Sequence, residues 1–470
     1  MKASKFGLLV LILGFGGTVE TAYQVRNHFG VGPWDWQVLT GNRFTGPSFS
    51  FEETESQVVP AGTAVEIDNA FGGVQAVPGA AGEVKVVLRK VVFRRTEEEA
   101  DTFARRIRLA RTMAGGTLRI GSNRREIEAG QQGNRVGFET HLEVTLPPGT
   151  RLKVVNEHGS IEVTDVAEAN LSGSFDSIRL DRVAGAATIE AQHGDVSVGD
   201  VTGVLAVNAR HGAVEVRQVK GRATLTVEHG DVTANEVGGL ELTIRHGELK
   251  ADGILGDLQV TGEHAGVEAR AVTGRVVVET AFQDVAIERV GGDVRLVSKH
   301  GKVRAADVAG ALYAEAGYDD VELERIAGPV EVRVAHGGLK AQALEKGGLV
   351  RTAGDDVVID GFRGGLDIQA ERGNVRLTAS GPMTEATSVH VTQGGIELAV
   401  ADGSRFALDA TAGPGGEISA NVAGFTAAES TPTRLTGTMG SGGSKVSLSA
   451  QGGNIELRNA AVASAENHPR

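Results

Sequence analysis

The chain contains no cysteine, and only 4% of its 470 residues are aromatic. The lack of cysteine excludes disulfides, thiolate metal sites, a cysteine nucleophile and a lipid-modified cysteine near the N-terminus. The scarcity of aromatic residues excludes a bulky core, while 66 glycines provide for many bends. Because 41% of the residues are hydrophobic, we expect a folded chain with thin cores of Val, Ala and Leu.

Positive charge and long apolar runs are also scarce. The net charge of −13 disfavours binding to nucleic acid. The apolar run at residues 6–19 follows Lys2 and Lys5, and its length suits a signal-peptide core better than a membrane span. We therefore expect residues 1–22 to be a signal peptide, or an N-terminal membrane anchor if uncleaved. The protein would then be extracytoplasmic, in the periplasm or at the cell surface.

A repeat of about 18 residues extends over more than half of the chain. One position, called the marker position here, lies three residues before a core aliphatic residue and recurs in steps of 17 or 18, with one final step of 21. Its occupants are His158, Phe175, His193, His211, His229, His246, His264, Phe282, His300, Tyr318, His336, Gly354, Arg372 and Gln393.

One unit, HGDVSVGDVTGVLAVNAR, shows period-2 alternation of apolar and polar residues between glycine bends, and it contains no helical stripe. Eighteen residues are too few for a strand–helix crossover, so each unit is expected to form one coil of a parallel β-solenoid. Fourteen such coils would make a rod of about 65 Å. The uneven spacing of Val196, Val201 and Val207 favours a right-handed β-helix over the left-handed hexapeptide form.

The expected organisation follows from where this repeat is regular. Residues 23–60 are expected to be a linker, and residues 61–153 an N-terminal β cap with one short helix at 97–106, where Thr96 and Glu99 form a capping box. The remaining segments are a regular β-solenoid at 154–400, an irregular C-terminal solenoid or cap at 401–458, and a polar tail at 459–470.

Three stretches make the chain resemble a known family. They are VTLPPGTRLKVVNEHGSIEVTDV, the TEEEADTF helix followed by GGTLRI, and the terminal GGSKVSLSAQGGNIEL. Together they resemble the adhesin-like family with DUF4097-type β-strand repeats, over roughly residues 60 to 458. The resemblance implies an exported β-helical rod and brings no catalytic residues. The chain differs from the family pattern in having mostly His-Gly, rather than Asn-Gly, at the bend.

The His-Gly pairs have three interpretations. Histidine is among the residues enriched in the left-handed backbone conformation, so the pairs can be turns whose imidazoles stack along one edge, which we favour. Alternatively, a row of flat rings could bind a linear glycan, or neighbouring imidazoles could share Zn²⁺. If the row is a binding site, its candidate residues are the five in consecutive coils, His193, His211, His229, His246 and His264. No metal site and no cofactor are predicted.

Acidic residues also recur, two positions after the marker. A calcium β-roll would need G-G-x-G-x-D nonapeptides, which the sequence lacks, so turn capping is the favoured interpretation. The carboxylate pairs at 319–320 and 355–356 are the only dense clusters that could serve a carbohydrate-active enzyme. No Ser-His-Asp spacing, phosphate loop or H-E-x-x-H is present, and no catalytic residues are predicted.

We therefore expect a non-enzymatic binding or structural rod of the cell envelope. Its partner would be an envelope or extracellular polysaccharide, or another protein, with the membrane contacted only through an uncleaved N-terminal segment. Two alternatives stay open, a self-assembling architectural protein and a carbohydrate-active β-helix enzyme. The sequence leaves the ligand and the oligomeric state undetermined.

Overall fold

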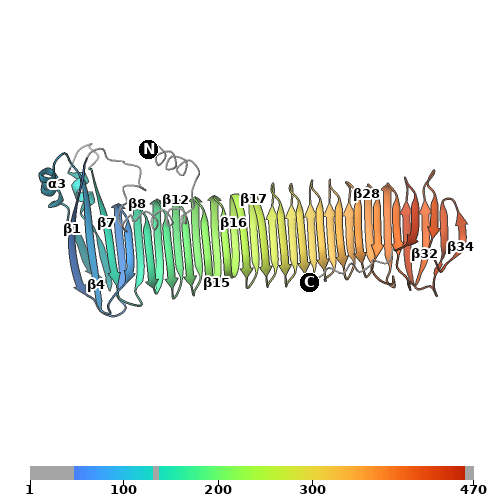
Figure 1. Cartoon of the computed structure of the whole chain (residues 1–470), viewed down its shortest axis with the longest axis horizontal. Helices are drawn as coiled ribbons and strands as arrows, with labels where there is room; N and C mark the ends of the chain where they lie inside the picture. The colour runs from blue at the N-terminus through green and yellow to red at the C-terminus, as the bar shows by residue number, and fades with distance from the viewer. Residues whose placement is uncertain (1–46, 131–136, 461–470) are drawn as a thin grey trace, which may run out of the picture.

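The computed structural model describes residues 47–130 and 137–460, which form one long β-solenoid (Figure 1). About 14 coils of about 18 residues stack in parallel, as the repeat predicted. The predicted signal peptide, most of the predicted linker and nearly all of the polar tail lie outside the described residues. Among the residues described, no helix is both long and apolar enough to cross a membrane.

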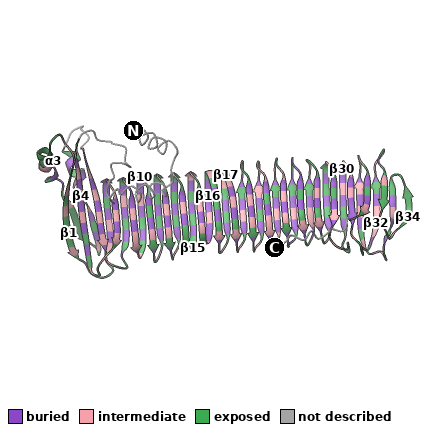
Figure 2. Ribbon diagram, in the orientation of Figure 1, coloured by how far each residue is buried: buried purple, intermediate pink, exposed green. Residues whose placement is uncertain are grey.

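Most of the regular coils contribute two strands, one on either side of the marker position. In β12 (Ala187–His193) and β13 (Val196–Val201), buried aliphatic residues alternate with outward-facing polar ones. Ile189 pairs in register with Val207 of the next coil, so the same inward row continues from coil to coil (Figure 2). Each fully buried aliphatic side chain contributes about 1.5 to 3 kcal/mol, and the repetition makes a narrow core without large aromatic residues.

The regular coils run from β8 to β31. Their strands are β8 (Arg151–His158), β9 (Ile161–Val166), β10 (Glu168–Phe175), β11 (Ile178–Val183), β12, β13, β14 (Leu205–His211), β15 (Val214–His229), β16 (Val232–Ile254), β17 (Leu258–Val272), β18 (Val276–Thr280), β19 (Val285–Val290), β20 (Val294–Ser298), β21 (Val303–Val308), β22 (Leu312–Ala316), β23 (Val321–Ile326), β24 (Val330–Val334), β25 (Leu339–Leu344), β26 (Gly348–Thr352), β27 (Val357–Phe362), β28 (Leu366–Arg372), β29 (Val375–Ala379), β30 (Thr387–Gln393) and β31 (Ile396–Val400).

At the N-terminal end the first coil is separated from the second by a long insertion. β2 (Ala64–Phe71) and β3 (Val74–Pro78) pair in parallel with β8 and β9, so that Phe71 is in register with His158. The insertion forms β4 (Glu83–Phe93), α3 (Glu97–Ala104), β5 (Leu109–Ala114), β6 (Thr117–Ser122), α4 (Arg124–Ala129) and β7 (Phe138–Leu146). β6 and β7 pair with the other side of β2 and β3 and cover the end of the rod.

Two expectations for this end are wrong. The last part of the predicted linker is strand β1 (Ser48–Val58), which pairs antiparallel with β4 along its whole length. Its sequence is mostly polar and carries little apolar alternation, so only the pairing with β4 shows it to be a strand. The described part of the cap also has two helices rather than one. The sequence pattern shows no sign of α4, because a helix of six residues is too short to show an apolar stripe.

At the C-terminal end the coils are also stacked out of chain order. The strands there are β32 (Phe406–Ala412), β33 (Ile418–Asn421), β34 (Phe425–Thr431), β35 (Arg434–Met439), β36 (Ser444–Ala450) and β37 (Ile455–Asn459). β36 and β37 pair with β30 and β31 on one side and with β32 and β33 on the other. The last strands of the chain are therefore held inside the stack, and the β34–β35 hairpin closes the rod.

An ion-pair cluster ties this inserted coil to the regular ones. Glu397 of β31 accepts hydrogen bonds from Arg376 of β29 and from Arg458 of β37. The hydrogen bond from Arg376 is the main reason why the pKa of Glu397 lies below its ordinary value, and partial burial opposes this effect. The carboxylate thus links three successive coils.

We predict that Glu397→Gln lowers the free energy of unfolding by about 1 kcal/mol at pH 7, and by less at acidic pH. Because the folded-state pKa is depressed, the stabilisation is present above the ordinary glutamate pKa and is lost as the pH falls through the folded-state value. Urea unfolding of both proteins at pH 7 and pH 3 measures the difference. A pH-independent difference would mean that packing, rather than charge, explains the effect.

Candidate binding surface

The residues at the marker position form one continuous stack of rings, called the ring ladder here. It consists of Phe71, His158, Phe175, His193, His211, His229, His246, His264, Phe282, His300, Tyr318 and His336. Neighbouring ring centroids lie 4.2 to 5.1 Å apart. The rings of the five consecutive histidines are nearly parallel, with interplanar angles of 0 to 11°. The predicted stacking is therefore confirmed, and Phe71 extends it by one coil.

The ring ladder lies on the surface of the rod. His193, His211, His229 and His246 are exposed, and His264 is half-buried. Because each ring inside the ladder is stacked on both faces, a ligand can reach only the ring edges. The ladder therefore presents imidazole N–H groups and nitrogen lone pairs at intervals of about 5 Å, rather than open aromatic faces.

The prediction that the histidines themselves adopt the left-handed backbone conformation at the bends is wrong. The positive φ at these bends belongs to the glycine after the ring, as at Gly194 (φ +121) and Gly212 (φ +132), and not to histidine. A Cβ added at Gly212 would lie 2.3 Å from the carbonyl oxygen of Gly194 in the preceding coil. The close stacking of coils thus requires the glycine, and the bend leaves the histidine side chain free for other roles.

A second row of left-handed residues escaped the sequence analysis. It lies seven positions after the marker and includes Asp165, Arg182, Asp200, Gln218, Glu236, Ala271, Arg289, Asp307, Arg325 and Ala343. The left-handed residue breaks the strand alternation, so the next aliphatic residue again points inward, as Val166 does after Asp165. The row was not recognised in the sequence because its side chains differ in chemistry, although the row recurs with a period of 17 or 18 residues that could have been detected.

The spacing of the ring ladder also bears on the zinc alternative. Rings stacked in this way keep equivalent atoms about as far apart as their centroids, 4.8 to 5.0 Å within the five-histidine run. Two imidazoles sharing Zn²⁺ need nitrogens no more than about 4.2 Å apart. A shared metal would therefore require the rings to leave their stack. Within residues 47–130 and 137–460, no group of three or more His, Asp or Glu side chains is arranged to hold a metal ion.

The acidic residues two positions after the marker cap the turns. Asp195 accepts a hydrogen bond from the backbone N–H of Ala213, one coil later, at 2.9 Å. The same bond to the next coil is made by Asp231, Asp284, Asp320 and Asp356. This confirms the turn-capping interpretation. Asp319 likewise accepts from the N–H of Gly301, so three of the four clustered carboxylates considered for catalysis bind backbone groups.

A groove of about 550 Å³ lies beside the ring ladder near Tyr318 and His336. Most of its residues come from two outward-facing rows, one position and three positions before the marker, on strands β20, β22, β24, β26, β28 and β30 and the bends after them, and the others come from the buried row between these two. The near row contributes Lys299, Gly317, Ala335, Ala353, Glu371 and Thr392, and the far row contributes Val297, Glu315, Arg333, Arg351, Gln369 and His390. The marker position gives no sign of this groove, because the residues that line it precede the marker.

A second hollow, of about 240 Å³, continues the groove toward the C-terminal end. The two share His390. Hydroxyl groups line the second hollow, from Ser388, Thr411, Ser447 and Ser449, together with Asp409 and Arg434. His390, Ser449 and Thr411 are in register on β30, β36 and β32, so the far row of the groove runs directly into this hollow.

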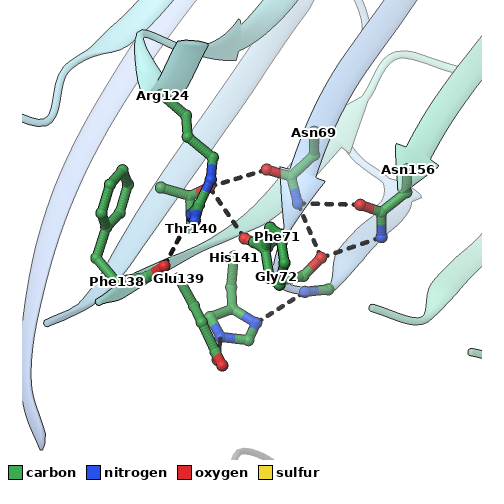
Figure 3. A network of polar contacts seen from close by, with 10 residues as sticks. Asn69, Phe71, Gly72, Arg124, Phe138, Glu139, Thr140, His141 and Asn156 are labelled. Carbon is green, nitrogen blue, oxygen red and sulfur yellow. Dashed lines mark hydrogen bonds and ion pairs between the residues drawn. The ribbon is translucent and has the colours of Figure 1, made fainter. Parts of the chain in front are cut away.

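Where the insertion leaves the first coil, a buried polar network holds the two together (Figure 3). Asn69 and Asn156 both donate to the carbonyl oxygen of Gly72, and the hydroxyl group of Thr140 donates to Asn69. Arg124 donates to the carbonyl oxygen of Phe138. Each buried donor and acceptor named here has a protein partner, so the network has a structural role.

Together, a parallel β-solenoid with a ring-lined flank and shallow grooves defines a binding or structural rod. The family profile described as Toastrack DUF4097 matches residues 95–286 and 241–458. The chain belongs to the Toastrack DUF4097 family, as the sequence resemblance predicted.

Two solved structures are also similar. A candidate cell adhesion protein from Clostridium sporogenes is 8% identical, with 87% of this chain and 100% of that chain covered at a TM-score of 0.15. A candidate adhesin from Parabacteroides merdae is 11% identical, with 60% of this chain and 95% of that chain covered at a TM-score of 0.17. Neither match bears on the function of this chain. No curated protein matches the sequence.

Proposed function

We propose that this protein is an exported, non-enzymatic rod of the cell envelope that binds an extended polysaccharide along its ring ladder and flanking face. The observation that carries the proposal is the continuous stack of rings from Phe175 to His336, in which every ring is exposed except the half-buried His264 and His300. An extended polymer can follow such a line over many coils, whereas a small ligand would need an enclosed pocket. The apolar N-terminal run with its two preceding lysines supports the proposed export.

The proposal predicts that histidine edges contribute to binding. The quadruple variant His193→Asn, His211→Asn, His229→Asn and His246→Asn should bind a recognised polysaccharide about tenfold more weakly, because four hydrogen-bonding ring edges are lost. Binding can be measured by calorimetry against cell-wall peptidoglycan fragments, polygalacturonate and dextran. The glycines keep the bends, so the variant should fold. Binding equal to wild type would make the histidines architectural only.

The proposal also predicts that a bound polysaccharide is not cleaved. Asp320 and Asp356 each accept a backbone N–H from the next coil, so they act as turn caps and not as a general acid and its partner. After prolonged incubation the polymer should show an unchanged size distribution by size-exclusion chromatography. Shortened chains, lost on changing Asp320 and Asp356 to Asn, would favour a carbohydrate-active enzyme instead.

Assembly into larger structures is a second candidate function, favoured by the edge strands. Among the strands that the structure describes, β34 pairs only with β35, and six of its seven residues are exposed. Strands with one unpaired edge can add a strand from another chain. Sedimentation velocity should show concentration-dependent association if β34 serves assembly, and Ala428→Lys should abolish it. A monomer at all concentrations would dispose of this candidate.

A further inference from the structure

We infer that the groove beside Tyr318 and His336 is the main polysaccharide site, and that its ligand is a linear polymer carrying carboxylates. This inference rests on the proposed binding function and narrows it to one stretch of the rod. The groove crosses six successive strands, β20, β22, β24, β26, β28 and β30, and is therefore about 24 Å long. It continues at His390 into the hydroxyl-lined hollow. Such a long, shallow shape suits an extended polymer.

Small residues in the near row form the floor of the groove. Next to Tyr318 and His336, the near row has only Gly317 and Ala335, and Ala353 follows in the next coil. Beside the five consecutive histidines the same row has long side chains, Gln192, Arg210, Glu228, Arg245 and Glu263. Long side chains flank the ladder there, whereas a polymer in the groove can approach both the ladder and the floor.

Polar side chains of the far row form the opposite wall, and neighbouring contacts hold two of them in place. Tyr313 donates to Glu315 at 2.5 Å, and Arg333 makes two hydrogen bonds with Glu331. Side chains held before binding lose less conformational entropy when a ligand arrives. The wall thus offers preorganised carboxylate and guanidinium groups to sugar hydroxyls.

The backbone beneath the groove favours a glycan over a peptide strand. Every strand that crosses the groove is paired on both sides, as β24 is with β22 and β26. No free edge is therefore available to a peptide that adds as a strand, and recognition depends on side chains. A polymer rich in hydroxyl groups suits the Arg, Gln, Glu and His side chains of the wall.

Charge in the groove indicates carboxylates on that polymer. Within the described part of the chain, the side chains of Lys299 and Arg351 have no hydrogen-bond or ion-pair partner, and both line the groove. In all, the lining has three cationic side chains, Lys299, Arg333 and Arg351, and two anionic ones, Glu315 and Glu371. The lining therefore carries a net positive charge. Arginine is well suited to carboxylates because its guanidinium can donate two parallel hydrogen bonds.

The test compares two groove variants with matched controls, using polygalacturonate, dextran and poly-glutamate as probes in calorimetry. Ala335→Gln with Ala353→Gln fills the floor with a residue that the same row already has at Gln192. Lys299→Gln with Arg351→Gln removes two of the three cations. The controls are Ala286→Gln on β19 and Lys340→Gln on β25, which make comparable changes on strands that lie outside the groove. Thermal unfolding checks that all variants are folded.

Each groove variant should bind polygalacturonate at least about tenfold more weakly, while both controls bind like wild type. The variant without Lys299 and Arg351 should also show a weaker salt dependence of binding. Wild type that binds none of the polysaccharides would overturn the proposed function. If wild type binds polygalacturonate and both groove variants bind it equally tightly, this inference alone would be overturned. Equal or tighter binding of dextran or poly-glutamate would overturn the choice of an acidic polysaccharide.

Discussion

Gly212→Ala should destabilise the protein by about 3 kcal/mol or more, although it adds a single methyl group. The new Cβ would lie 2.3 Å from the carbonyl oxygen of Gly194, and the residue has φ +132, which L side chains rarely adopt. Moving the coils apart would lengthen the hydrogen bond from the N–H of Gly194 to His211 and separate the stacked rings. Urea unfolding followed by circular dichroism measures the loss.

Gly115→Ala is the matched control for this prediction. Gly115 has φ +57, and a Cβ built there meets nothing within 4 Å, so only backbone strain of about 1 kcal/mol is expected. His211→Asn should cost less than about 1 kcal/mol, since it leaves the glycine bend in place. If Gly212→Ala and Gly115→Ala proved equally destabilising, the close approach between coils would not explain the glycine.

Arg124→Met should loosen the insertion without affecting the regular coils. The Arg124 side chain is 3% exposed, and its guanidinium lies 4.5 Å from the ring centroid of Phe71 and 4.3 Å from that of Phe138. Burial lowers the pKa of Arg124, and the charge of Glu128 opposes this effect. Methionine keeps much of the volume but removes the hydrogen bond to the carbonyl oxygen of Phe138, at a cost of about 2 kcal/mol.

Hydrogen exchange is the measurement that locates this loss. Protection should fall in β4 and β7, while coils far along the rod, such as β20 to β28, stay protected because each coil contacts only its neighbours. Arg125→Met is the control, since the Arg125 side chain is 66% exposed and should matter little. Equal protection in the two variants would contradict an anchoring role for Arg124.

Most of the rod could be predicted from the sequence, because the interactions that build it are nearly local. A residue such as Val207 faces inward because the strand alternates, and its partner Ile189 lies 18 residues away. The same period placed the rings of His193 and His211 in contact. In a solenoid, residues that are one period apart in the sequence lie side by side in adjacent coils. The register of the repeat was therefore sufficient to predict which residues are in contact.

The two ends of the rod could not be predicted in this way. The pairing of Phe71 with His158 spans 87 residues, and the pairing of β30 with β36 likewise skips the segment that covers the end. β1 has a polar sequence, and only β4 beside it makes it a strand. These elements depend on partners distant in sequence, for which the local pattern holds no signal.

Part of the candidate site could likewise be predicted from the sequence, and part of it became visible only in the structure. The solenoid, the stacked rings and the family could be predicted because each follows from an 18-residue pattern or a local motif. The stacked coils were needed to show that the left-handed conformation belongs to Gly212 rather than His211, and that a groove lies beside Tyr318. The groove depends on the relative lengths of side chains in two neighbouring rows, and those lengths shape a surface only when the coils are stacked.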